Sequence, residues 1–276
     1  MPMLNLMLNP LFLKALVGVA LASLMSMIGA VALLRGVAYL PAEVSHSALG
    51  GAAVGVLLSA YVSPAFEPFL MAIAFSVATA LLTEYAGRRE GPEMMGAAIG
   101  GALAVTMSIY ALIRGIVPGE LKAIIDGYLI GDLLLLSVSD IVELASVAAL
   151  VLFFLTTFYS EFVYLCFDMD GAEALGINVK LYDALLFGLT GLAGVVATKA
   201  IGALLVYAFI IAPAAAAKEL ASSVKLHLTL TFVIALTSGI LGLGLSMALN
   251  LPASGVVAAI PSTVYIAFLI FRSFRK

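Results

Sequence analysis

The stretch FDMDGAEALGINVK, residues 167–180, is a polar interruption between two long apolar runs, and it divides the chain. It carries the signals of one very short helix. Asp170 can cap the free amides of a first turn, Glu173 follows three residues later in capping-box register, and Gly176 can supply the left-handed residue that ends the helix. Because so short a helix is unstable by itself, the stretch predicts a loop helix that lies against the protein's own surface or against a soluble partner.

The composition predicts a membrane protein. Of 276 residues, 64% are apolar and 11% are charged, whereas a soluble domain carries roughly 25% charged residues. The single cysteine, Cys166, excludes an internal disulfide and a cysteine metal cluster within one chain. The thirteen Lys and Arg residues are scattered along the sequence, so we expect no nucleic-acid surface. Residues 1–10 lack a basic region, and the apolar run that follows is long enough to span, so we expect no cleaved signal peptide.

Apolar segments long enough to cross about 30 Å of hydrocarbon recur along the whole chain. We therefore predict an all-α, polytopic membrane protein with eight to nine transmembrane helices in a single domain, residues 1–276. The number stays open because only Thr198 and Lys199 separate the sixth and seventh segments, which suits either a tight hairpin or a broken, partly re-entrant element. The predicted segments are 11–34, 39–62, 69–83, 94–113, 141–166, 181–197, 200–217, 226–249 and 256–271.

Basic residues predict the orientation, because they accumulate on the cytoplasmic side of membrane proteins. If the amino terminus starts outside, the cytoplasmic side receives most of them, and the outer side keeps Lys14, Arg114, Lys122 and Lys199. This orientation puts residues 167–180 in the cytoplasm together with the carboxy terminus. The basic residues then expected inside are Arg35, Arg88, Arg89, Lys180, Lys218, Lys225, Arg272, Arg275 and Lys276.

The second apolar segment begins with two side chains that can bind a cation. Glu43 and His46 are three residues apart, so on a helix they share a face. A carboxylate oxygen and a neutral imidazole nitrogen suit zinc or manganese. Since two ligands do not complete a site, others would come from a neighbouring helix or from a second copy of the chain. The alternative is a hydrogen-bonded structural contact.

The segment between the fourth and fifth spans, residues 114–140, is polar and on this topology faces outside. Asp126 and Asp132 lie within it, and Glu143 lies near the outer end of the fifth span. An acidic entrance formed by these residues would concentrate cations. The alternatives are an ordinary solvated loop and, for Glu143, an ion pair with Arg114.

Two stretches, GGAAVG at 50–55 and GAAIGG at 96–101, contain the G-x-x-x-G spacing that lets helix backbones approach closely. They predict helix contacts, either within the chain or across a dimer. Pro213 lies inside the seventh span, where its missing amide is expected to bend the helix.

Catalytic motifs are missing. The sequence has no G-x-S-x-G, no H-E-x-x-H and no G-x-x-x-x-G-K-[ST] phosphate loop. We therefore predict a transport permease and not an enzyme. A pump of this kind must use an ion gradient or borrow ATP hydrolysis from another polypeptide.

Several stretches together resemble the membrane permeases of zinc, manganese and iron ABC importers, the ABC-3 type related to vitamin B12 and siderophore permeases. The resemblance covers nearly the whole chain in order. Its stretches are RGVAYLPAEVSHSALGGAAVGVLL at 35–58, YLIGDLLLLSVSDI at 128–141, FDMDGAEALGINV at 167–179, ATKAIGALLVYAFIIAPAAAAK at 197–218 and, more loosely, NLPAS at 250–254.

This resemblance implies a type II importer-like fold, a homodimer with its pathway on the dimer axis, and a place in the cell membrane. His46 then matches the family's pathway histidine, and Glu43 lies one place after the family's aspartate position, which is Ala42 here. The implied partners are a cytoplasmic ATPase homodimer that uses ATP and an extracytoplasmic binding protein that delivers the transported metal ion; no covalent cofactor is expected. The residues implied to couple to the ATPase, within the segment 167–180, are Asp170, Glu173, Ala174, Leu175 and Gly176.

Two other functions remain open from the sequence. The first is an ABC permease that carries a metal chelate or a vitamin. The second is a secondary transporter driven by a proton or sodium gradient, which would need no ATPase.

Overall fold

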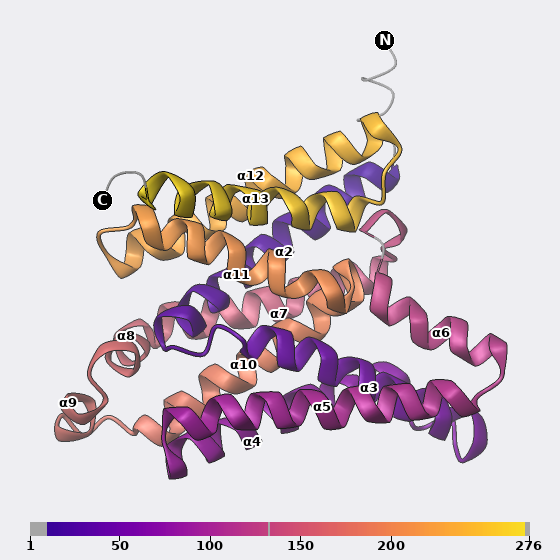
Figure 1. The fold of residues 1–276 in the computed structure, drawn as a ribbon, viewed down its shortest axis with the longest axis horizontal. Coiled ribbons are helices and arrows are strands. Elements are labelled where there is room, and N and C mark those ends of the chain that lie inside the picture. Colours follow the sequence, from indigo (N-terminus) through magenta and orange to yellow (C-terminus); the bar gives the residue numbers. More distant parts are fainter. Residues whose placement is uncertain (1–9, 132, 274–276) are drawn as a thin grey trace.

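The computed structural model describes residues 10–131 and 133–273, and all regular elements in those ranges are helical. Figure 1 shows the long helices running side by side along one axis. The elements are α2 (Pro10–Leu34), α3 (Leu40–Tyr61), α4 (Pro68–Glu90), α5 (Pro92–Ile116), α6 (Gly119–Ile130), the 3₁₀ turn η1 (Leu133–Leu135), α7 (Val138–Thr157), α8 (Tyr159–Phe167), α9 (Met169–Ala174), α10 (Val179–Ile201), α11 (Ala203–Leu220), α12 (Val224–Leu249) and α13 (Ala253–Ser273).

The predicted eight to nine spans are confirmed. Among the residues described, eight helices are long and apolar enough to cross a membrane: α2, α3, α4, α5, α7, α10, α12 and α13. The eighteen-residue α11 runs back beside α10 as a ninth long helix (Figure 1). The joint between α10 and α11 is Gly202, with φ of 84°, and Thr198 and Lys199 belong to the last turn of α10. The sixth and seventh predicted segments therefore form the tight hairpin and not the broken, partly re-entrant element.

The fifth span is shorter than predicted. The apolar run 141–166 is not one helix, because α7 ends at Thr157 and the chain turns at Phe158, with φ of −110° and ψ of 32°, into α8. About 20 residues suffice to cross the hydrocarbon core, and α7 has 20. The remaining apolar residues therefore form a separate short helix at the end of the bundle, next to α9 (Figure 1).

The third span is longer than predicted. Helix α4 continues to Glu90, so Arg88 and Arg89 lie in its last turn and not in a loop. The turn into α5 is made by Gly91, with φ of 97°. Glu84 is buried and faces Arg88 with 3.4 Å between Oε1 and Nε, so this ion pair is shielded from solvent on the Glu84 side.

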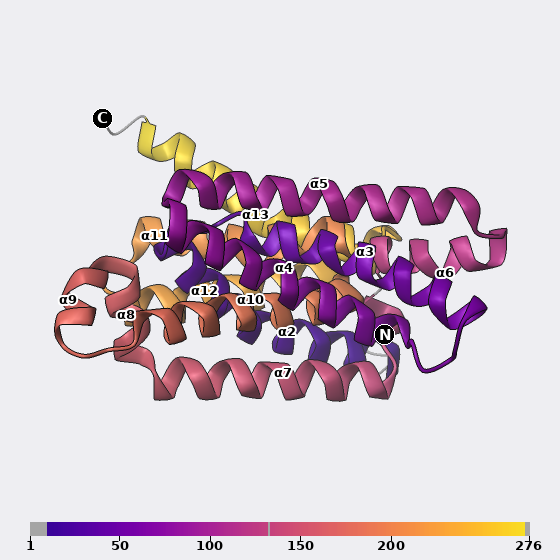
Figure 2. The ribbon, with the colours of Figure 1, turned by 90° about the horizontal axis from the view of Figure 1, so that it is seen from below.

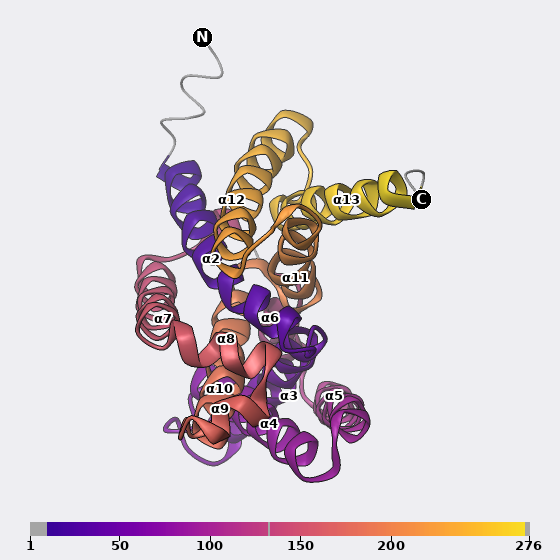
Figure 3. The ribbon, with the colours of Figure 1, turned by 90° about the vertical axis from the view of Figure 1, so that its left-hand side faces the viewer.

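The interior of the bundle is formed by α2, α3, α10 and α11, with the other long helices around them (Figures 2 and 3). In the 18-residue apolar window of α10, 72% of the residues are buried, whereas in that of α5 17% are buried. The first glycine stretch explains how α3 fits. A Cβ on Gly51 would lie 2.5 Å from the carbonyl oxygen of Met71, and one on Gly55 would lie 2.5 Å from Cα of Pro68, so α4 packs directly on these glycines.

The second glycine stretch behaves differently. A Cβ on Gly96, Gly100 or Gly101 would meet nothing within 4 Å, and all three residues are exposed on α5. Within the described chain, the close contacts predicted from glycine spacing are therefore made by the α3 stretch only. The α5 stretch leaves a face of small residues on the outside of the bundle.

The two ends of the bundle separate the basic residues as predicted. In Figure 1, the left-hand end carries α8, α9, the turn from α4 to α5 and the loop from α11 to α12. Arg35, Arg88, Lys180, Lys218 and Lys225 belong to these turns or to the adjoining helix ends. The start of α2 and the joint between α5 and α6 lie at the opposite end (Figure 1), where Arg114 and Lys122 stand. The positive-inside rule therefore predicts that α9 is at the cytoplasmic end.

Candidate functional site

Helix α9 has a different start from the one predicted. Asp168, and not Asp170, is the N-cap: its carboxylate accepts a hydrogen bond from the amide of Gly171 at 2.9 Å. Asp170 is the second helical residue, and Glu173 therefore cannot complete a capping box with it. The physical reason is local: Gly171 has no Cβ, and one built there would lie 2.2 Å from Oδ2 of Asp168. The glycine at this position lets the carboxylate close over the first turn.

The end of α9 is the one predicted. Gly176 has φ of 80°, a conformation that glycine adopts without strain. Its amide donates to the carbonyl of Glu173 at 3.0 Å, and the amide of Ile177 donates to the carbonyl of Ala172 at 3.0 Å. This pair of bonds is the Schellman arrangement. Asp168 and Gly176 thus hold a helix of six residues that propensity alone would not form.

Most of α9 is open to solvent. Only Ala172 is buried, and it anchors the helix to the body of the protein. Asp170, Glu173 and Ala174 are exposed, and the side chain of Leu175 is 65% exposed. A large apolar side chain presented on a short, well-capped helix outside the membrane is typical of a surface that another protein covers.

Charged side chains from distant parts of the chain meet beside α9. Arg35, at the end of α2, makes a bidentate pair with Asp183 of α10, with both N–O distances at 2.9 Å. The two side chains are 12% and 4% exposed. A cavity of about 390 Å³ lies next to this pair and is lined by Arg35, Gly87, Arg88, Met95, Met169, Asp170, Glu173, Val179, Lys180 and Asp183. Helix α9 packs on α8 and α10, and its charged side chains line the same cavity as the Arg35–Asp183 pair.

Sequence reasoning missed Asp183. A signal was available, since an ionisable residue in an apolar segment marks a function or a buried partner, and Asp183 lies within the predicted sixth span. The sequence could not name the partner, because Arg35 is 148 residues away.

Glu43 and His46 lie in α3 but have different surroundings. Glu43 is fully buried, its Oε1 accepts a hydrogen bond from Ser47 at 3.2 Å, and its Oε2 has no hydrogen-bond partner. Ser47 in turn donates to Thr106 of α5 at 3.4 Å, so the carboxyl group faces the interior between helices. His46 is half-buried, and its Nδ1 lies 2.7 Å from the carbonyl oxygen of Ala42.

Because a carbonyl oxygen only accepts, Nδ1 of His46 carries the hydrogen in this bond, and Nε2 keeps its lone pair. A backbone carbonyl that fixes one ring nitrogen while the other is left to coordinate is a common arrangement of metal-binding histidines. Among the residues described, no group of three or more His, Cys, Asp and Glu side chains is gathered to hold a metal ion. A full coordination sphere within the described part of one chain is therefore not formed.

The residues of the predicted acidic entrance lie in ion pairs where the structure describes them. Asp126 of α6 accepts two bonds from Arg114, at 2.7 and 2.8 Å, and one from the hydroxyl of Tyr110 at 3.0 Å. The hydrogen bonds from Arg114 lower the pKa of Asp126. Glu143 pairs with Lys199 at 2.9 Å and not with Arg114. Asp132 lies outside the described residues.

Lys199 lies between two carboxylates at this end. Its Nζ is 2.8 Å from Asp140 and 2.9 Å from Glu143, and it is 4.4 Å from the centre of the Phe69 ring. The three charged groups sum to one net negative charge. An acidic entrance stays a prediction, with much of its charge offset by Arg114 and Lys199.

Pro213 lies inside α11, as predicted, and its residue is buried. Because proline has no amide hydrogen, the carbonyl of Phe209 receives no helical hydrogen bond from position 213. The bend expected there stays a prediction.

A model of the ABC 3 transport family matches residues 5–272 of this chain. The chain belongs to the ABC 3 transport family. Among the relatives of this family member, the manganese transport system membrane protein MntC of Listeria monocytogenes is 30% identical over 261 residues, 93% of this chain and 89% of MntC. The high-affinity zinc uptake system membrane protein ZnuB of Haemophilus influenzae is 27% identical over 236 residues, 86% of this chain and 87% of ZnuB.

The fold of this ABC 3 family member is also that of a solved structure. PsaBC from Streptococcus pneumoniae in complex with Fab matches with a TM-score of 0.80 and 23% identity, covering 96% of this chain and 92% of that one. The predicted all-α, polytopic importer fold is confirmed, and the protein is a multi-pass protein of the plasma membrane. Neither the ABC 3 transport family nor the relatives MntC and ZnuB indicate an enzymatic activity.

Proposed function

We propose that this chain is the permease subunit of an ATP-driven importer of a divalent metal ion: zinc, manganese or iron. It works with a separate cytoplasmic ATPase, which uses the ATP, and with an extracytoplasmic protein that delivers the metal; the chain itself carries no covalent cofactor. The observation that carries the proposal is α9, a capped and exposed helix at the basic end of a bundle of the ABC 3 transport family.

Helix α9 supports coupling to an ATPase because it is both exposed and firmly connected. Leu175 presents an apolar contact, Asp170 and Glu173 present charge, and Ala174 and Gly176 lie exposed beside them. The packed Ala172 connects this segment to the core beside α10, and the Arg35–Asp183 pair joins α10 to α2 next to it. Movement of a partner that grips α9 would therefore reach the spanning helices.

His46 and Glu43 support a metal pathway along α3. We assign Nε2 of His46 as the nitrogen that contacts the passing cation, since Nδ1 is held by Ala42. Glu43, three residues before it, supplies a buried carboxyl group with a free oxygen. Because one described chain does not gather a full ligand set, the remaining ligands would come from a second copy, and the small-residue face of α5 is an available surface for a homodimer.

The names of the relatives favour metal ions as substrate, since MntC is a manganese transport protein and ZnuB a zinc uptake protein. A metal-chelate or vitamin importer is the nearer alternative, and competition between free manganese, zinc or iron(II) and a siderophore or cobalamin separates the two. A gradient-driven secondary transporter is the more distant alternative, and it would transport without an ATPase.

Reconstitution tests the proposal. The chain, placed in liposomes with the ATPase encoded beside it and its binding protein, should take up the metal only with ATP, and the mass of the purified complex gives the number of permease copies. The His46→Ala variant should abolish uptake while it still assembles with the ATPase. His46→Gln, which keeps a side chain of similar size, is the matched control for the loss of side-chain volume in His46→Ala. Metal uptake by the chain alone, or unchanged uptake by His46→Ala, would argue for a different transporter or a different ligand, respectively.

A further inference from the structure

Two neighbouring depressions at the cytoplasmic end share the residues Leu34 and Val224. One is a cavity of about 350 Å³ next to the loop between α11 and α12, and its lining includes Lys218, Ser222, Ser223 and His227. The other is an apolar groove between α2, α7, α8 and α12. A lipid has a polar headgroup joined to apolar chains, so a polar chamber that continues into an apolar groove matches the chemistry of a lipid.

The polar chamber favours a negative charge. Ser223 is the N-cap of the 26-residue helix α12, so the chamber contains the start of a long helix, where free amides and the helix dipole attract anions. Lys218 is exposed and adds a positive charge at the same place.

His227 gives a second and independent indication of a ligand. It is 3% exposed and lines the chamber. Its Nε2 lies 2.8 Å from the carbonyl oxygen of Ala214, so Nε2 carries the hydrogen, and its Nδ1 has no partner. A buried acceptor without a donor is costly, and the hydroxyl group of a ligand would satisfy it.

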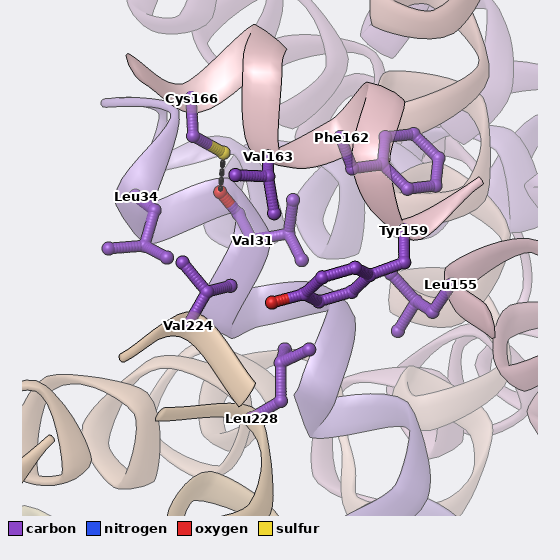
Figure 4. Close-up of a pocket in the computed structure, with 9 residues that line it drawn as sticks. All are labelled: Val31, Leu34, Leu155, Tyr159, Phe162, Val163, Cys166, Val224 and Leu228. Carbon is purple, nitrogen blue, oxygen red and sulfur yellow. Dashed lines mark hydrogen bonds between the residues drawn. The ribbon is translucent and has the colours of Figure 1, made fainter. Parts of the chain in front are cut away.

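The adjoining groove is shown in Figure 4. Phe162, Val163 and Leu228 form part of its apolar wall, together with the ring of Tyr159. The thiol of Cys166 donates to the carbonyl of Val31, 3.7 Å away, and burial raises the pKa of this thiol to about 12. The groove itself holds only about 10 Å³, but Tyr159, Val163 and Cys166 along it are half-buried, so these side chains form a track that is open to the surface. Such a track suits one hydrocarbon chain lying along the surface.

Charge also borders the groove. Nζ of Lys225 lies 5.6 Å from the centre of the Tyr159 ring. Lys218, which lines the chamber, and Lys225, in the first turn of α12, thus lie at the end of the bundle where the positive-inside rule predicts the inner leaflet. Basic residues at this boundary attract anionic lipids.

We propose that this composite site binds one anionic phospholipid of the inner leaflet whose headgroup carries a hydroxyl, as phosphatidylglycerol does. The phosphate lies at Lys218 and the amino end of α12, a headgroup hydroxyl donates to Nδ1 of His227, and one acyl chain follows the groove past Val163. A free phosphate ion would leave the apolar groove without a role. This site does not depend on the proposed transport function.

The test uses the full chain in nanodiscs that contain phosphatidylcholine with a small share of photoreactive phosphatidylglycerol. Crosslinks identified by mass spectrometry are expected in α8 and in the first half of α12. Lys218→Ala should reduce this crosslinking about 5-fold, and Val163→Trp should reduce it by filling the groove without a change of charge. Lys122→Ala, at the opposite end of the bundle, is the matched control and should leave it unchanged.

Two further experiments distinguish an anionic lipid headgroup from a free phosphate ion. An excess of inorganic phosphate should not displace the lipid, and photoreactive phosphatidylcholine should give no crosslinks at these positions. Displacement by phosphate would show a free-anion site and overturn the proposal. So would equal crosslinking by the two lipids, or crosslinking that Lys218→Ala and Val163→Trp both leave intact. Circular dichroism of each variant confirms that it is folded.

Discussion

At the scale of single residues, the most consequential pair is Arg35 and Asp183. Both are largely buried, and their two hydrogen bonds at 2.9 Å satisfy charges that the apolar surroundings would otherwise leave unpaired. The pair joins the end of α2 to the first turns of α10, beside the exposed α9. The pair therefore stabilises the fold and also fixes the end of α2 against α10.

Removal of one partner should cost more than removal of both. We expect Asp183→Asn to destabilise the protein by about 3–5 kcal/mol, because Arg35 is left buried without a countercharge. The double variant Arg35→Met with Asp183→Leu should recover most of this loss. Thermal unfolding in detergent measures the stability of the single and of the double variant. Equal stability of Asp183→Asn and the natural protein would show that water or another group already compensates Arg35.

At the scale of elements, α9 shows how two end residues define a helix of six. Asp168 satisfies the first amides and Gly176 ends the last turn, while the helix between them offers exposed side chains to a partner. The sequence named the final glycine correctly and misplaced the cap by two residues. Several acidic residues in succession can act as caps, and only the fold of the backbone selects one of them.

The coupling role of α9 can be tested at its glycine. A β-branched side chain at the positive φ of Gly176 costs about 1–2 kcal/mol, so Gly176→Val should loosen the helix end and reduce transport-coupled ATP hydrolysis. Gly176→Asn is the matched control, since asparagine tolerates this conformation, and it should retain coupling. ATPase activity of the reconstituted complex is the measurement. Full coupling in Gly176→Val would mean that the partner does not depend on the shape of this segment.

At the scale of the whole molecule, the long helices run along one axis, so the two ends of the bundle lie on opposite sides of the membrane (Figure 1). The nine long helices among the described residues carry α6 and the start of α2 at one end and α9 at the other (Figure 1). The basic residues beside α9 predict that this end is cytoplasmic. The coupling proposal requires the same orientation, because ATP is available only inside.

Cysteine labelling tests this orientation. In a Cys166→Ser background, Glu120→Cys on α6 and Glu173→Cys on α9 both give exposed thiols. A maleimide that cannot cross membranes should label Glu120→Cys in intact cells, and it should label Glu173→Cys only after the cells are permeabilised. The opposite pattern would invert the topology and remove the proposed ATPase contact.

The sequence by itself determined the membrane class, the range of eight to nine spans and the short polar helix, and it predicts the orientation. These properties follow from local hydropathy, charge and capping signals, which act over a few residues. Tertiary structure alone decided which groups meet: Arg35 with Asp183, Lys199 with Asp140 and Glu143, and Glu43 with the interior and not with His46. It also decided that the glycines of α3 pack while those of α5 face outward. Such pairings depend on how whole helices rotate and pack against one another, and helical spacing along one segment does not contain that information.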